Sequence, residues 1–161
     1  MKKMFIIVLI LIGVLFLNGC TGMSRYNVRI VDENYKIKEE FLNNNKTFGS
    51  YDETTQSYIN DRNVPEEYTY VVNTEQELNN IFSEFPKIDF NKEMVIVYVY
   101  TSIYNEDRKI IDVDIDEGEL SIDFKYKLKP FSGSAVNPYQ KTLIIIMDRV
   151  IVRSVDVDLD D

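Results

Sequence analysis

Residues 94–100 read MVIVYVY, an unbroken run of apolar and aromatic side chains. β-Branched and aromatic residues favour extended backbone. A strand that is apolar at every position is typical of one that is covered on both faces. We therefore expect residues 94–100 to form the central strand of a sheet, with other elements packed above and below it.

A helix is predicted before this strand, over residues 74–85. Thr74 and Glu77 have the spacing of a capping box, in which a hydroxyl and a carboxylate satisfy free amide groups at a helix N-terminus. One apolar stripe follows at i, i+3, i+4 and i+7: Leu78, Ile81, Phe82 and Phe85. Pro86 prevents the helix from continuing. The stripe predicts that the helix packs on the sheet.

Further strands are predicted around these two elements. Residues 26–31 and 68–72 have strand composition. In residues 111–128, apolar and polar side chains alternate on both sides of Asp116-Glu117-Gly118, which is typical of a β-hairpin with one solvated face. Residues 143–147 are apolar, and residues 155–160 alternate apolar side chains with aspartate. These patterns favour antiparallel pairing.

The predicted fold class is α+β and mainly β: an antiparallel sheet or sandwich of about six strands, with one helix at about 74–85 packed on it. The predicted organisation is a lipoprotein signal peptide at 1–19, a tether at 20–25, an N-terminal strand and irregular arm at 26–67, and a mainly-β domain at 68–161. Within the arm, Ile37, Phe41 and Leu42 indicate one short helix.

The first twenty residues resemble a bacterial lipoprotein signal. Lys2 and Lys3 precede an uncharged apolar stretch at 4–17, the n-region and h-region of a secretory signal. As a helix this stretch reaches about 21 Å, which is short of the about 30 Å of a hydrocarbon core. The lipobox pattern follows as Leu17, Asn18, Gly19 and Cys20. An ordinary signal peptide, or an uncleaved anchor with a stray cysteine, is the alternative.

Cys20 is the only cysteine of the chain, so it has no intramolecular disulfide partner. A diacylglyceryl lipid on its sulfur explains the residue, and two acyl chains hold a protein stably on a membrane. We expect no other cofactor. The expected location is the extracytoplasmic face of the bacterial cell membrane, with the membrane as a partner through the lipid anchor.

Composition limits the possible functions. Removal of residues 1–19 leaves 16 basic and 27 acidic side chains, a formal net charge of −11. This charge disfavours nucleic acid, whose binding depends on clustered Lys and Arg, and it predicts that the domain stands off an anionic membrane on its tether. The chain has no histidine, which removes the commonest general base and imidazole metal ligand. A non-enzyme is therefore favoured.

The region from Tyr68 to the C-terminus resembles a group of small extracytoplasmic domains of low-GC Gram-positive bacteria. The resemblance is carried by TEQEL (74–78), IDFNKEMVIVYVY (88–100) and NPYQKTLIIIMDR (137–149). This layout is similar to the C-terminal domain of PrcB, a subunit associated with a surface protease complex. The resemblance implies a non-catalytic domain that accompanies or regulates other envelope proteins. A Gly-Gly-Tyr-like turn of that family is replaced here by residues 103–107.

Four tyrosines form a candidate binding platform: Tyr68, Tyr70, Tyr98 and Tyr100. They lie at i, i+2 spacing on two predicted strands, where they could present aromatic faces to a peptide or to cell-wall glycan. The alternative is that these rings pack inside the domain, as aromatic residues in strands usually do.

Acidic residues form weak candidate metal ligands at Asp112, Asp114 and Asp116, before Gly118. Alternating oxygen ligands suit Ca²⁺, but the glycine comes one place late and the intervening Val and Ile favour a solvated strand face. The acids near the C-terminus, at 156, 158, 160 and 161, are interpreted in the same way as a charged sheet edge. Ser132-Gly133-Ser134 has no adjacent base and is interpreted as a loop.

The favoured function is a lipid-anchored cell-envelope protein that acts as a non-catalytic binding or accessory module. Its partner would be another envelope protein or a cell-wall component. Two alternatives stay open: an envelope enzyme that uses paired carboxylates, and a calcium-stabilised structural domain.

Overall fold

The computed structural model describes residues 25–31, 35–103, 106–128 and 137–160. Along the chain its elements are β1 (Val28–Val31), α2 (Glu39–Asn44), β2 (Tyr51–Asp52), β3 (Ser57–Tyr58), β4 (Glu67–Val72), α3 (Glu75–Ile81), β5 (Glu93–Ser102), β6 (Glu106–Asp116), β7 (Glu119–Leu128), β8 (Tyr139–Asp148) and β9 (Ser154–Asp160). The predicted α+β, mainly β fold class is confirmed, with a second helix and additional short strands.

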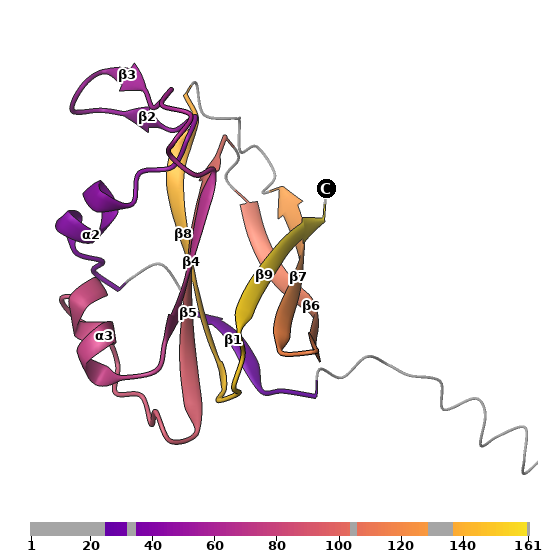
Figure 1. Cartoon of the computed structure of the whole chain (residues 1–161). Helices are drawn as coiled ribbons and strands as arrows, with labels where there is room; N and C mark the ends of the chain where they lie inside the picture. Colours follow the sequence, from indigo (N-terminus) through magenta and orange to yellow (C-terminus); the bar gives the residue numbers. More distant parts are fainter. Residues whose placement is uncertain (1–24, 32–34, 104–105, 129–136, 161) are drawn as a thin grey trace, which may run out of the picture.

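The elements form three layers (Figure 1). The middle layer is a four-stranded antiparallel sheet in the order β1-β8-β5-β4. A three-stranded sheet, β6-β7-β9, covers one face of it, and the two helices cover the other. A two-stranded sheet, β2-β3, lies at one end of the molecule.

The run that was expected to form the central strand lies in β5, which is hydrogen-bonded to β4 on one side and to β8 on the other. Its side chains alternate between two cores. Met94, Ile96, Tyr98 and Tyr100 contribute to the core between the two sheets. Val95, Val97 and Val99 contribute to the core beneath the helices. Burial on both faces explains why no polar residue interrupts the run.

Helix α3 begins at the predicted capping box. The Glu77 amide donates to Thr74 Oγ1 at 3.2 Å, and the Thr74 amide donates to Glu77 Oε2 at 3.1 Å. The helix ends at Ile81, earlier than predicted, because residues 36–38 pair with the following backbone. The Lys38 amide donates to the Ile81 carbonyl at 2.9 Å. This pairing turns Phe82 into extended conformation, from which its ring still packs in the core beneath the helices.

The predicted hairpin is formed by β6 and β7. Glu117 and Gly118 at its turn have φ values of 47° and 87°, so both lie in the left-handed region. Such turns match the twist of the flanking strands, and glycine adopts this backbone without strain. After β8 the chain crosses from the middle sheet to the three-stranded sheet, where β9 pairs with β7 in parallel.

The predicted arm is more ordered than its polar composition indicated. Helix α2 includes Phe41 and Leu42, where one short helix was expected. Small polar side chains of the arm form hydrogen bonds with β5. Thr47 is fully buried, and its Oγ1 lies 2.6 Å from Thr101 Oγ1. The Thr101 hydroxyl also donates to the Phe48 carbonyl at 3.1 Å. These contacts place the arm against the sheet.

Several predicted features lie outside the described residues. They include the signal peptide at 1–19, the lipobox with Cys20, the serines at 132 and 134, and Asp161. Across the stretches that the structure describes, no helix has the length and hydrophobicity needed to cross a membrane.

Candidate functional site

The N-terminal half of β8 carries the residues of the candidate site. β8 pairs with β5 along its full length. On its other side, Ile144 to Met147 of β8 pair with the described residues of β1. Residues 139–143 lie before this pairing with β1.

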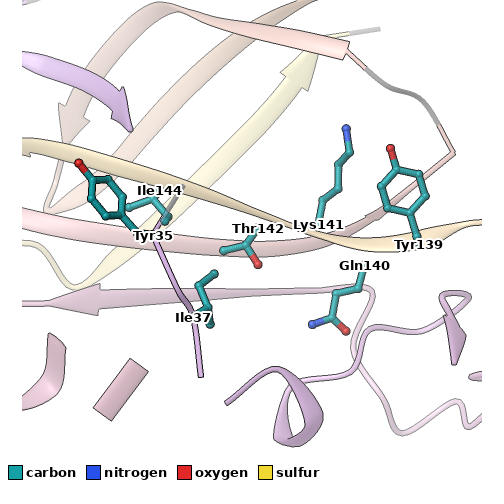
Figure 2. Close-up of a pocket in the computed structure, with 7 residues that line it drawn as sticks. All are labelled: Tyr35, Ile37, Tyr139, Gln140, Lys141, Thr142 and Ile144. Atoms are coloured by element: carbon teal, nitrogen blue, oxygen red, sulfur yellow. The ribbon is translucent and has the colours of Figure 1, made fainter. Parts of the chain in front are cut away.

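A cavity of about 310 Å³ lies beside this half of β8 (Figure 2). Its lining residues are Tyr35, Ile37, Tyr139, Gln140, Lys141, Thr142 and Ile144. Strand alternation separates the polar ones: Tyr139 and Lys141 project from one face of β8, and Gln140 and Thr142 project from the other. The Lys141 ammonium lies 5.4 Å from the centre of the Tyr139 ring, within range of a cation–π contact.

A second cavity of about 250 Å³ adjoins the first, because Gln140 and Thr142 line both. Its other lining residues come from α2, from the segment that follows it and from the β2-β3 turn: Leu42, Asn43, Lys46, Ser50, Tyr51, Asp52, Glu53 and Thr54. We refer to the two adjoining cavities as the β8 groove. The groove follows the N-terminal half of β8.

An ion pair lies in the second cavity. The Lys46 ammonium contacts Asp52 Oδ2, and the Asp52 side chain is only 8% exposed. The hydrogen bond from Lys46, helped by the Thr54 amide, lowers the pKa of Asp52 to about 2. Asp52 is therefore ionised at neutral pH and unable to act as a proton donor there.

The groove offers hydrogen-bonding groups and one aromatic wall. Gln140 and Thr142 supply side-chain donors and acceptors, and Tyr139 supplies the aromatic ring. Asp52 and Glu53 add two carboxylates to the second cavity, and Asp52 is paired with Lys46.

The four tyrosines do not form one platform, so that hypothesis is wrong. Tyr68 is opposite Val99 in the sheet, and Tyr70 is opposite Val97. Their rings therefore lie on the helix-covered face, whereas Tyr98 and Tyr100 lie in the core between the two sheets. The single-residue offset across the β4-β5 pair sends the two pairs to opposite faces.

Each tyrosine pair has structural contacts of its own. The Tyr70 hydroxyl donates to Asn45 Oδ1, and the Tyr70 ring meets Phe41 edge-on at 5.1 Å. The Tyr98 hydroxyl donates to Glu67 Oε2, and burial together with this bond raises the pKa of Tyr98. These contacts show that the tyrosine rings contribute to packing and hydrogen bonding within the fold.

The candidate calcium residues lie on β6 as an exposed strand face. Asp112, Asp114 and Asp116 are exposed, whereas Val113 between them is buried. Among the described residues, no group of three or more acidic side chains has an arrangement that could hold a metal ion.

The β8 groove was not predicted from the sequence. Residues 139–142 lie before the strand predicted at 143–147, and residues 42–54 of the second cavity were assigned to the irregular arm. A partial signal was present: Lys46 and Asp52 flank Gly49, whose φ of 77° bends the chain back on itself. Comparisons with protein family models, with curated proteins and with solved structures find no match to this chain.

Proposed function

We propose that this protein is a bacterial lipoprotein, anchored through a diacylglyceryl group on Cys20, that acts outside the cell membrane as a non-catalytic binding or accessory module. The lipobox supports the anchor, and the sequence resemblance to the PrcB C-terminal domain supports an accessory role. In this proposal the β8 groove binds an extended segment of another envelope protein.

The observation that carries the binding role is the groove itself, two adjoining cavities along β8 whose lining combines an aromatic ring, amide and hydroxyl side chains and the Lys46–Asp52 ion pair. Alternate side chains of an extended peptide segment would enter the two cavities, where polar groups and an aromatic ring would contact them.

Site-specific photocrosslinking on intact cells tests this function. A photoreactive amino acid replaces Thr142, which lines both cavities, and Lys109, an exposed residue of β6, serves as the matched control position. We expect one discrete crosslinked protein from position 142 and none from position 109. Identical products from both positions, or crosslinks to wall glycan alone, would contradict a peptide-binding groove.

A further inference from the structure

The loop between β8 and β9 exposes one large apolar side chain. Residues 149–153 read RVIVR, and Ile151 is 96% exposed. Val150 and Val152, on either side of it, pack against the core between the sheets. Because both neighbours point inward, Ile151 is held pointing away from the protein.

The same loop is fixed at both ends. The Arg149 amide donates to the Lys92 carbonyl at 2.7 Å, and the Arg153 amide donates to the Gly118 carbonyl at 2.7 Å. The Arg149 guanidinium also donates to the Phe90 carbonyl. The turn before β5 and the turn between β6 and β7 thus hold the two ends of the loop. The folded structure therefore keeps Ile151 exposed.

This loop lies beside the point at which the tether enters the fold. The Asp148 amide donates to the Asn27 carbonyl at 3.0 Å, so the loop starts next to the residue that precedes β1. Figure 1 shows the β8-β9 connection and the start of β1 at the same end of the molecule. Cys20 precedes Asn27 by seven positions, which at full extension span about 24 Å. A lipid on Cys20 therefore keeps the loop close to the membrane.

Exposed basic residues lie next to the apolar tip, on the loop itself and on the adjacent turn. Arg149 and Arg153 flank it and are both exposed, and the Lys92 side chain on the adjacent turn is 81% exposed. Acidic residues at this end include Asp89, which pairs with Lys92 at 3.6 Å, and Glu117 in the hairpin turn. Arg149 and Arg153 thus lie two positions before and after Ile151, and the bond from the Arg149 amide to the Lys92 carbonyl brings the turn that carries Lys92 to the same loop. Arg and Lys beside an inserted apolar group are typical of membrane-interface contacts.

We propose that Ile151 inserts into the interface of the phospholipid membrane that holds the lipid anchor, with Arg149 and Arg153 facing lipid phosphates. This inference rests on the proposed anchoring at Cys20 and replaces the expectation that the domain stands off on its tether. β8 runs about 30 Å from Tyr139 to Asp148. Contact at the 149–153 loop therefore directs the β8 groove away from the membrane.

A fluorescence experiment on the lipidated protein tests this orientation. The mature chain, purified from membranes, is reconstituted into vesicles of phosphatidylglycerol and phosphatidylethanolamine that contain a headgroup-nitroxide lipid. An NBD label is placed at Ser154→Cys beside the tip, or at Ser57→Cys in β3 at the opposite end. Lipidation occupies the sulfur of Cys20, so each variant has one free thiol.

We expect strong quenching of the label at 154 and little at 57. Ile151→Asp should reduce the ratio of docked to undocked protein by about tenfold or more, the effect of exposing one isoleucine again. Ile111→Asp, at another exposed isoleucine, should leave the quenching unchanged. Vesicle-bound protein with equal quenching at 154 and 57 would overturn the contact while leaving the anchor intact. Protein that does not sediment with vesicles would overturn the anchor, and the contact with it.

Discussion

Asn27, just before β1, and Asp148, at the end of β8, are joined by hydrogen bonds in both directions, and we call this contact the Asn27–Asp148 clamp. The Asp148 amide donates to the Asn27 carbonyl, and the Asn27 amide donates to Asp148 Oδ2, both at 3.0 Å. The Asn27 side-chain amide adds a bond to the same carboxylate at 3.1 Å. This clamp fixes the start of β1 beside the loop that carries Ile151.

Asp148→Ala should lower the free energy of unfolding by about 1–2 kcal/mol, because it leaves two donors of Asn27 without their acceptor. Asp158→Ala is the matched control, since it removes the same charge from an exposed position on β9. Urea denaturation measures both. Equal effects of the two substitutions would show that the clamp does not stabilise the fold.

Tyr98 should make the protein sensitive to alkali. Its pKa is raised in the folded state by burial and by the hydrogen bond to Glu67. The unfolded chain therefore loses this proton first, near pH 10, and stability falls as the pH rises above that value. Thermal unfolding of wild type and Tyr98→Phe from pH 8 to pH 11 tests this, with Tyr58→Phe as an exposed control. The decline in melting temperature with rising pH should be shallower in Tyr98→Phe than in wild type or Tyr58→Phe. Parallel curves for the three proteins would refute a raised pKa of Tyr98.

Asp52 should contribute to stability down to low pH. Its pKa is lowered to about 2 by Lys46, so its stabilising effect is complete above the unfolded value of 3.8 and is lost as the pH falls through about 2. Asp52→Asn should remove the loss of stability that accompanies protonation of Asp52 at low pH. Glu53→Gln, at the exposed neighbouring residue, should leave this loss unchanged. Melting temperatures between pH 5 and pH 2 measure the difference. An unchanged slope in Asp52→Asn would contradict the ion pair.

The capping box should stabilise α3 measurably. Thr74→Ala is expected to cost about 1 kcal/mol, because the Glu77 amide loses its acceptor. Thr74→Ser keeps the hydroxyl and should recover most of the loss. Chemical denaturation of the three proteins provides the measurement, and equal stability of the Ala and Ser variants would exclude a role for the hydroxyl.

The sequence predicted correctly those elements that depend only on residues close together in the chain. The apolar run of β5, the capping box at Thr74 and the turn at Gly118 each depend on neighbouring residues, and each is found where it was expected. The fold class followed from the order of these elements. The early end of α3 was not predictable in this way, because it depends on pairing with residues 36–38 far away in the sequence.

The candidate site depends on pairing between distant segments, which a single sequence does not reveal. The second cavity of the β8 groove joins residues 42–54 with Gln140 and Thr142, and nothing in either segment indicates that they meet. The tyrosine hypothesis was wrong for a related reason, since the offset between β4 and β5 decides which face each ring occupies. The exposed tip at Ile151 is also a tertiary feature, because inward packing of Val150 and Val152 leaves it outside.

Intact-mass and N-terminal peptide analysis of the membrane-bound protein tests the central claim most directly. We predict a mature chain that begins at Cys20 and carries a diacylglyceryl group on its sulfur, and a Cys20→Ser variant that no longer appears in this processed membrane form. A mature N-terminus at another residue, or a Cys20→Ser protein that stays in the membrane fraction with unchanged processing, would contradict lipid anchoring.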